Sequence, residues 1–293
     1  MPPLSPARIN MEIKNKIIDG QQIAEKVKDE IALEIFERQD TRRPSLAIIL
    51  VGERPDSQLY VSLKEKEAKK VGIDTHLYHF DEMVEEQQLM EAIDFLNKDP
   101  EVDAILIQLP LPSSLNTDKI VAELDSYKDA DGFHPQHPEY VLSPVVAAVD
   151  YIVDDLKLSG RACIFHRSDI FGETLKKHLE TKGLTVDLLA VGEDENPMTD
   201  EILRGRLSET SRQADIVVTA LGLPLFLDKE YIKEGATVID VGINKDHGHV
   251  HGDVDFESVI EKAAAVTPVP GGIGPMTIAF LFKNVIAIYN HRQ

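Results

Sequence analysis

The sequence predicts an α/β protein with two domains, each built around a parallel sheet. Short apolar runs such as Ser45–Val51 (SLAIILV) are typical of strands that are buried on both faces. Segments with apolar residues four positions apart, as in 21–38, lie between these runs and indicate helices. The alternation stops at 129–144, where a glycine and three prolines predict a domain boundary. Strands that alternate with helices in this way form parallel sheets with right-handed crossovers.

The first half of the chain repeats a strand-helix unit. The expected elements are a helix at 21–38, a strand at 45–51, a helix at 57–71, a weaker strand at 76–80, a helix at 85–97, a strand at 104–108 and a short helix at 118–124.

The second half repeats the same kind of unit and ends in a helix. The expected elements are a helix at 145–156, a strand at 162–165, a helix at 171–181, a strand at 185–190, a helix at 199–212, strands at 216–220 and 237–241, and a closing helix at 275–289.

Composition limits the function classes. Asp and Glu number 51 against 31 Lys and Arg, and the net charge of −20 disfavours nucleic acid or an anionic membrane as a partner. No apolar run approaches the roughly 18 residues of a membrane span and no secretory signal is recognisable, so we expect a cytoplasmic protein. The single cysteine, Cys163, excludes an intramolecular disulfide and a multi-cysteine metal site, and we expect it to be a small buried hydrophobe.

The segment Thr267–Thr277 is dense in residues with special backbone properties. Six of its eleven residues are Pro or Gly. Pro fixes φ, and Gly lets another group approach the main chain closely, so the segment is either a loop shaped around a ligand or a stiff turn before a helix. Pro275, at the expected first turn of the closing helix, fits both interpretations.

Three side chains share one face of the helix that follows the first strong strand. Ser57, Tyr60 and Lys64 are spaced i, i+3 and i+7. Ligands of open α/β sheets bind beyond the carboxyl ends of the strands, where this helix begins. A partly desolvated Lys has a lowered pKa and can exchange protons near neutrality. The alternative is an ordinary solvated lysine, since three more follow on the same helix.

A second strand end and the loop at the domain boundary bring further polar groups. Gln108 ends the strand at 104–108 and leads into two prolines. Asp129, Asp131 and His134 lie in the following loop, whose simplest interpretation is a surface turn. The spacing matches no calcium loop, and we expect no metal.

Together these segments resemble the bifunctional methylenetetrahydrofolate dehydrogenase/cyclohydrolase family. The resemblance spans most of the chain and is carried by Ile18–Gly20, Ser57–Lys64 with Val71–Ile73, Gln108–Pro112, Lys128–Pro135, Gly235–Ile243, Gly252–Val254 and Thr267–Thr277.

The resemblance implies an N-terminal α/β catalytic domain that binds folate (1–143), a Rossmann-like dinucleotide-binding domain (144–274) and a C-terminal helix (275–293) that packs back on the first domain. It implies oxidation of 5,10-methylenetetrahydrofolate with NADP or NAD, and hydrolysis of the methenyl product to 10-formyltetrahydrofolate. It also favours a homodimer. The alternatives are an enzyme that retains the hydrolysis alone and a folate-binding protein without turnover.

The resemblance also assigns roles to residues. Lys64 transfers protons in the hydrolysis, Gln108 is its hydrogen-bonding partner, Tyr60 stacks on the folate and Asp131 anchors the pterin. Ser57 and the backbone of Pro270, Gly271 and Gly272 complete the substrate site. The expected dinucleotide site comprises His166, Arg167, Ser168, Gly172, Gly222, Gly242 and Ile243.

The dinucleotide half departs from the family pattern at two places. His166 replaces a usual glycine, and its side chain restricts the approach of a phosphate to the backbone. The acidic run Glu193–Glu195 replaces a usual His-Ser or His-Arg pair. These carboxylates disfavour the 2′-phosphate of NADP and suit the 2′-hydroxyl of NAD, or they are a solvated loop, whereas Arg167 favours NADP.

One histidine cluster is expected to have no role in metal binding. His247, His249 and His251 alternate along a short polar segment before Gly252. A metal site is the alternative interpretation, but the segment is more typical of a hairpin tip.

Overall fold

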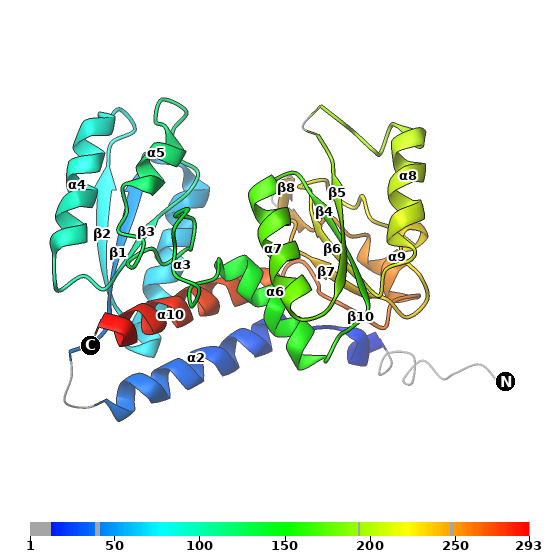
Figure 1. Cartoon of the computed structure of the whole chain (residues 1–293), viewed down its shortest axis with the longest axis horizontal. Helices are drawn as coiled ribbons and strands as arrows, with labels where there is room; N and C mark the ends of the chain where they lie inside the picture. Colours follow the sequence, from blue (N-terminus) through cyan, green and yellow to red (C-terminus); the bar gives the residue numbers. More distant parts are fainter. Residues whose placement is uncertain (1–12, 39–41, 193, 247–248, 293) are drawn as a thin grey trace. The chain divides into compact units, whose positions relative to one another are not determined.

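The computed structural model describes residues 13–38, 42–192, 194–246 and 249–292, and Figure 1 follows the chain through them. Contacts divide the chain into two compact units. The first unit comprises Ala24–Pro144 and Thr277–Gln293, and the second comprises Met1–Ile23 and Val145–Met276. Each unit contains its own parallel sheet, as the alternation of strands and helices predicts.

The first unit is built on a three-stranded sheet of order β2-β1-β3. Its elements are α2 (Gly20–Glu37, which begins in the second unit), β1 (Ser45–Val51), α3 (Pro55–Val71), β2 (Asp74–Phe80), α4 (Glu86–Lys98), β3 (Ala104–Ile107) and α5 (Thr117–Ala122).

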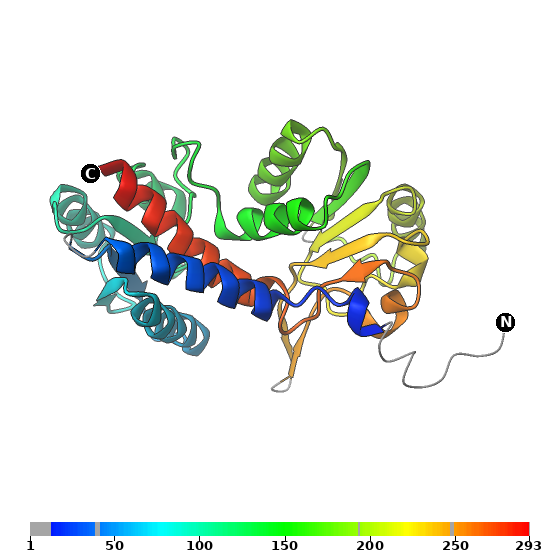
Figure 2. The same ribbon diagram turned by 90° about the horizontal axis from the view of Figure 1, so that it is seen from below.

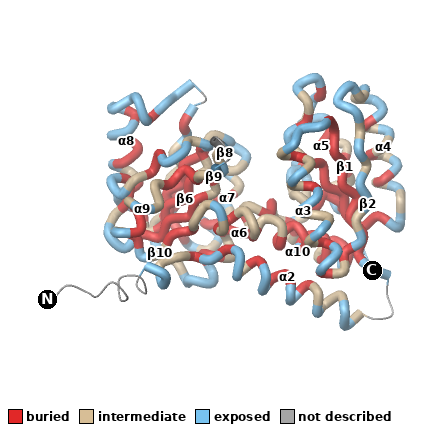
Figure 3. The backbone as a smooth tube through the Cα atoms, turned by 180° about the vertical axis from the view of Figure 1, so that it is seen from behind, coloured by how far each residue is buried: buried red, intermediate tan, exposed pale blue. Residues whose placement is uncertain are grey.

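Every residue of the central strand β1 is buried, because helices cover both faces of its sheet. Ala47 and Ile49 pack with α4 and α5 in one apolar cluster, and α3 lies on the opposite face (Figure 1). The edge strand β2 is mostly exposed. The colours of Figure 3 show this contrast between the buried central strand and its neighbour.

The second unit is built on a five-stranded sheet of order β10-β7-β6-β4-β5. Its elements are α6 (Pro144–Asp155), β4 (Arg161–His166), α7 (Asp169–Thr181), β5 (Thr185–Ala190), α8 (Glu201–Ser211), β6 (Ile216–Ala220), the short helix η1 (Lys229–Tyr231), β7 (Thr237–Asp240), the hairpin β8 (Asn244–Asp246) and β9 (His249–His251), α9 (Phe256–Ile260) and β10 (Ala265–Val266).

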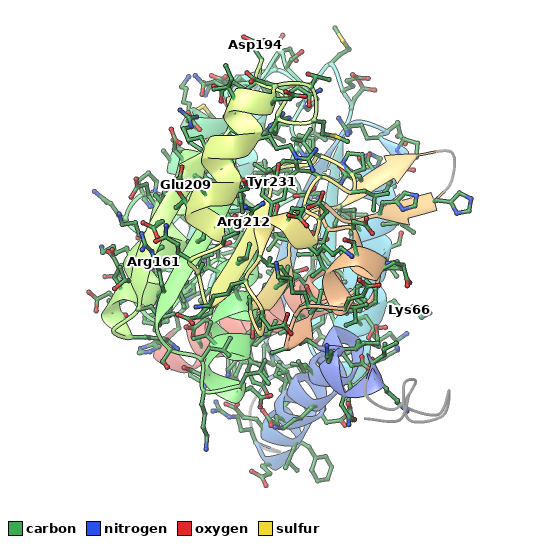
Figure 4. All side chains as sticks on the ribbon, turned by 90° about the vertical axis from the view of Figure 1, so that its right-hand side faces the viewer. Lys66, Arg161, Asp194, Glu209, Arg212 and Tyr231 are labelled. Carbon is green, nitrogen blue, oxygen red and sulfur yellow. The ribbon has the colours of Figure 1, made fainter. Side chains whose placement is uncertain are left out.

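Helices lie on both faces of this second sheet (Figure 2). Cys163 and Phe165 of β4 point into an apolar cluster with α8, α9 and η1, while α7 packs on β4 and β5. Cys163 is buried, as expected, and burial raises its pKa to about 12, so the thiol is inert. At the start of β4, Arg161 forms an ion pair of 2.5 Å with Asp187, and Figure 4 labels this arginine.

The chain before α2 adds to the edge of the second sheet. Ile17 forms a parallel bridge with Val266, and Ile18 N donates to Val266 O at 2.9 Å. The described residues before Ala24 therefore group with the second unit, although the sequence pattern assigns 1–143 to one domain. The unpaired edge of the short strand β10 explains this placement, because it offers backbone groups that an extended segment can satisfy.

The closing helix α10 (Ile273–Arg292) begins in the second unit and ends in the first. Among the described residues it is the one helix long and apolar enough to cross a membrane, but 61% of its apolar window is buried in the molecule, as in a core helix. Asn284 Nδ2 donates to the carbonyls of Ala130 and Leu142 at 2.8 and 2.7 Å. These bonds fix α10 to the loop that contains Asp131.

Candidate active site

Helix α3 carries the predicted lysine at the carboxyl end of β1. Pro55 opens the helix, where its missing N–H costs nothing, and Gly72 closes it with a φ of 92°, a conformation that favours glycine. Ser57 is buried, and Tyr60 and Lys64 are half-buried on the same side. The helical spacing therefore places the three side chains as predicted.

Gln108 meets Lys64 from the end of β3. Its backbone N–H donates to Ile49 O at 2.8 Å, which ties the residue to β1. Its side-chain Oε1 accepts a hydrogen bond of 2.9 Å from Lys64 Nζ, and its Nε2 donates to Leu109 O at 2.8 Å. Because the ammonium of Lys can only donate, these two bonds fix the orientation of the amide.

In the loop after β3, the side chains of Lys128 and Asp129 hold the backbone that carries Asp131. Asp129 accepts hydrogen bonds from the N–H groups of Asp131 and His134 at 3.0 and 2.7 Å. Lys128 is buried, and its Nζ donates at 2.8 and 2.7 Å to the carbonyls of Leu96 and Asp99, at the end of α4. The loop is therefore a built structure rather than an open surface turn, and it holds Asp131.

Lys64 and Asp131 act on each other's ionisation. Burial lowers the pKa of Lys64, and the negative charge of Asp131 partly offsets this effect. Burial raises the pKa of Asp131 to about 6, against the opposing influence of Lys64. No hydrogen bond from a described residue reaches the Asp131 carboxylate. A lysine with an accessible neutral form therefore lies near a carboxylate that is free to bind a ligand.

The second unit holds the predicted dinucleotide residues where β4 runs into α7. Ser168 caps the helix by accepting a hydrogen bond of 3.4 Å from Phe171 N. His166 ends β4 with 2% of its surface exposed, and neither ring nitrogen has a hydrogen-bond partner among the described residues. A Cβ added to Gly172 would lie 2.7 Å from the ring of His166. The imidazole thus lies against the first turn of α7, where Gly172 provides the space.

The acidic segment after β5 folds back on itself. Glu195 Oε2 accepts a hydrogen bond of 2.7 Å from Gly192 N, and Glu195 O accepts one of 3.2 Å from Arg167 Nη2. Asp194 is exposed (Figure 4), and Glu193 lies outside the described residues. The carboxylate of Glu195 is therefore used within its own turn, and the guanidinium of Arg167 lies beside that turn.

Sequence reasoning missed a buried pair of carboxylates at the ends of β6 and β7. Asp253 accepts five hydrogen bonds, from Thr219 Oγ1, the N–H groups of Leu221, Gly222 and Leu223, and Asn244 Nδ2, at 2.7 to 3.3 Å. Asp240 accepts three, from the N–H groups of Gly242, Asp253 and Val254, at 2.9 to 3.1 Å.

The close approach of these carboxylates to the backbone explains why glycines occupy positions 242 and 252. A Cβ on Gly242 would overlap Asp253, and one on Gly252 would overlap Asp240. Burial, followed by the charge of Asp253, raises the pKa of Asp240 to about 7. The sequence signal available for this pair was an aspartate close to a glycine in each segment, as Asp240-Val-Gly242 and Gly252-Asp253. Of the predicted dinucleotide residues here, Gly222 and Gly242 flank the pair, and Ile243 is exposed.

The loop before α10 packs against the start of α2. Gln21 N donates to Gly271 O at 3.1 Å, and a Cβ on Gly20 would overlap the carbonyl of Gly272. Gly271 has a φ of 105°, which favours glycine. Pro270, Gly271 and Gly272 therefore form a shaped loop in the second unit, whereas Lys64 lies in the first.

The histidine segment forms a hairpin. β8 pairs antiparallel with β9, and the rings of His249 and His251 are 6.3 Å apart. His247 lies outside the described residues. Over the described ranges, no three His, Cys, Asp or Glu side chains are grouped as for a metal ion.

Two family models match the chain. Residues 18–131 match the catalytic domain of tetrahydrofolate dehydrogenase/cyclohydrolase, and residues 149–293 match its NAD(P)-binding domain. The bifunctional protein FolD of a Sulfurihydrogenibium species is 39% identical over 285 residues, which cover 94% of this chain and 98% of that protein.

Two solved structures resemble the chain over 94% of its length. The bifunctional FolD of Campylobacter jejuni is 36% identical with a TM-score of 0.87, and 99% of it is covered. The FolD of Trypanosoma brucei, solved with NADP and an inhibitor, is 30% identical with a TM-score of 0.85, and 97% of it is covered. The chain therefore belongs to the tetrahydrofolate dehydrogenase/cyclohydrolase family, the bifunctional NAD(P)-binding enzymes that its sequence motifs indicate.

Proposed function

We propose that this enzyme oxidises 5,10-methylenetetrahydrofolate to the 5,10-methenyl cation with NADP and hydrolyses the cation to 10-formyltetrahydrofolate. The observation that supports the proposal most is the hydrogen bond of 2.9 Å between Lys64 Nζ and Gln108 Oε1, with the carboxylate of Asp131 nearby. A folate-binding protein without turnover has no need of a desolvated lysine at this position.

In the hydrolysis, Lys64 is the proton-transfer group. The oxygen of a water molecule bonds to the methenyl carbon, neutral Lys64 Nζ takes a proton from that water, and one of the two carbon-nitrogen bonds at this carbon breaks. The freed nitrogen takes one proton, one proton is released overall, and the formyl group remains on the other nitrogen. Burial of Lys64 favours the neutral amine, and the positive charge of the substrate favours it further.

The other residues of the first unit bind and orient the substrate. Gln108 holds the Lys64 amine in place through Oε1. Asp131 accepts hydrogen bonds from the amino and ring N–H groups of the pterin, and Tyr60 stacks on the folate. Ser57, buried on the same helix as Tyr60 and Lys64, completes the part of the proposed substrate site that lies in the first unit.

The residues at the start of α7 fit the phosphates of a nicotinamide dinucleotide, which supplies the hydride acceptor when bound. The first turn of a capped helix presents N–H groups to an anion, and the ring of His166, which forms no hydrogen bond with a described residue, offers a further donor. We assign His166, Arg167, Ser168 and Gly172 to the phosphates, and Gly222, Gly242 and Ile243 to the nicotinamide side.

Arg167 supports NADP over NAD. Its guanidinium lies beside the turn after β5, where the ribose of the adenosine binds in this class of fold, and the carboxylate of Glu195 is turned into its own loop. Arg167→Ala should raise the KM for NADP at least tenfold and leave the KM for NAD within twofold. Equal effects on both cofactors would contradict the assignment.

We further infer a cytoplasmic homodimer that does not bind nucleic acid or membranes. The family resemblance supports the dimer, and the net charge of −20 disfavours polyanionic partners. Light scattering on the purified chain tests the dimer, since a monomer mass at micromolar concentration would contradict it.

Lys64→Met tests the hydrolytic role, and Lys66→Met on the same helix is the matched control. We expect Lys64→Met to slow the consumption of methenyltetrahydrofolate by roughly 10² to 10⁴-fold, the usual contribution of a general base, while Lys66→Met stays near the unmodified rate. Hydride transfer is followed separately by methenyl absorbance with NADP or NAD. Unchanged hydrolysis in Lys64→Met would refute the role, and absence of methenyl formation with either cofactor would favour an enzyme that retains the hydrolysis alone.

A further inference from the structure

A cavity in the first unit lies at the opposite edge of the sheet from Lys64. It has a volume of about 410 Å³ and lies between the ends of α2 and α3, the chain that enters β1, and the last turns of α10. Pro44, at its wall, immediately precedes β1, whereas Lys64 and Gln108 lie at the carboxyl ends of β1 and β3. The volume is in the range of sites for small molecules.

The cavity combines an apolar floor with a basic rim. The floor contains Ile35, Val71, Ile286 and the ring of Tyr289. The rim contains Arg38, Arg42, Arg43, Lys69 and Lys70, while the acidic lining residue is Glu34. Such an excess of cations is unusual in a chain with a net charge of −20.

Two of the five cationic side chains form no close ion pair with a described residue of the unit. Arg42 is held by Asp103 at 2.6 Å, Arg38 by Glu34 at 2.8 Å and Lys70 by Glu67 at 2.5 Å. Arg43 lies 3.8 Å from Asp74, with both side chains more than half exposed. Lys69 has no hydrogen bond or ion pair to any described residue. Arg43 and Lys69 are therefore available to a ligand.

The aromatic ring in the floor is rigid. Tyr289 is 1% exposed, and its hydroxyl donates to Arg42 O at 2.7 Å. The guanidinium groups of Arg42 and Arg38 lie 5.4 and 5.9 Å from the centre of its ring. The cavity therefore offers apolar surface at its floor and cations at its mouth.

We propose that this cavity binds a small aromatic anion, with its ring on the apolar floor and its phosphate or carboxylate group between Arg43 and Lys69. The proposal concerns a site separate from the folate chemistry and does not depend on it.

The absence of tryptophan from the chain allows a direct test. Phe36 lines the cavity and is 67% exposed, so Phe36→Trp places a single fluorescent reporter there. Phe95 on α4 is 62% exposed and does not line the cavity, so Phe95→Trp is the matched control. The probe is phenyl phosphate. Inorganic phosphate, which has the charge without the ring, and phenol, which has the ring without the charge, are titrated as the two comparison arms. Saturating NADP is present throughout to block the dinucleotide site. We expect saturable quenching by phenyl phosphate in Phe36→Trp alone, with an affinity at least fivefold higher than for either arm.

Charge reversal locates the anion. In the Phe36→Trp background, Lys69→Glu should weaken phenyl phosphate binding at least fivefold, while Lys66→Glu, with the same change in net charge but outside the cavity, should leave it within twofold. Circular dichroism confirms that each variant is folded. The proposal is overturned by no saturable response in Phe36→Trp, by inorganic phosphate binding as tightly as phenyl phosphate, or by equal effects of the two charge reversals.

Discussion

The packing of His166 against Gly172 leads to a quantitative prediction for Gly172→Ala. The added Cβ would lie 2.7 Å from Cγ and 2.8 Å from Cδ2 and Nδ1 of the imidazole. Non-bonded carbon atoms prefer a separation of about 3.5 to 4.0 Å, so the methyl group overlaps three ring atoms by roughly 0.7 Å or more. His166 is 2% exposed and cannot move aside without disturbing its neighbours.

The expected cost is the difference between two effects. Overpacking of this kind costs about 1 to 3 kcal/mol, whereas Ala is preferred over Gly inside a helix by about 1 kcal/mol. We therefore expect Gly172→Ala to lower the free energy of unfolding by up to about 2 kcal/mol when His166 is present. In a His166→Gly background the overlap is gone, and the same change should stabilise by up to about 1 kcal/mol.

Urea unfolding followed by far-ultraviolet circular dichroism measures all four members of this double-mutant cycle. The predicted coupling energy between positions 166 and 172 is about 1 to 3 kcal/mol. A stabilising Gly172→Ala in the presence of His166, or additive effects of the two changes, would refute the packing argument. NADP affinity of the same variants then shows whether the imidazole also serves the cofactor.

Three further predictions concern stability. Because the pKa of Asp240 is raised to about 7, the folded chain keeps a proton on this carboxyl at pH values where the unfolded chain has released it. The free energy of unfolding, measured by urea titration, should therefore fall from pH 5 to pH 7. The fall should be shallower in Asp240→Asn. Because the pKa of Lys128 is lowered to about 8, the free energy of unfolding should rise between pH 8 and pH 10 in the unmodified chain and not in Lys128→Met. Lys128→Met also loses two hydrogen bonds, which should lower the free energy of unfolding by about 1 to 3 kcal/mol. Gly20→Ala should lower the urea midpoint markedly because its Cβ overlaps the carbonyl of Gly272, and an unchanged midpoint would contradict that contact.

The strands show what the pattern of residues can predict. β1, β5 and β6 have the predicted bounds because each is a run of residues that suits a buried or half-buried strand. The short elements α9 and β10 were not predicted, since five and two residues are too few to show a period. Helices α3 and α7 each begin two residues earlier than predicted, because Pro55 and the cap Ser168 set their starts rather than the apolar pattern.

The first-unit site was more predictable than the second-unit site for a physical reason. Lys64 and Gln108 follow from helical spacing and from the rule that parallel strands end at one edge, and their hydrogen bond is the outcome. The inward position of the His166 ring depends on the space above Gly172, which only three-dimensional packing reveals. The same holds for Lys128, whose motif suggested a site but whose amine bonds to the end of α4.

The buried Asp253 and Asp240 differ from Asp131 in the number of hydrogen bonds that their carboxylates accept. Asp253 accepts five and Asp240 three, and the donors include backbone N–H groups of the loops they hold. The Asp131 carboxylate accepts none from the described residues, although burial raises its pKa. A desolvated carboxylate without donors is costly unless a ligand provides them. We propose that a pterin offers the donors that Asp131 lacks, so that the desolvation of this carboxylate in the free enzyme favours substrate binding.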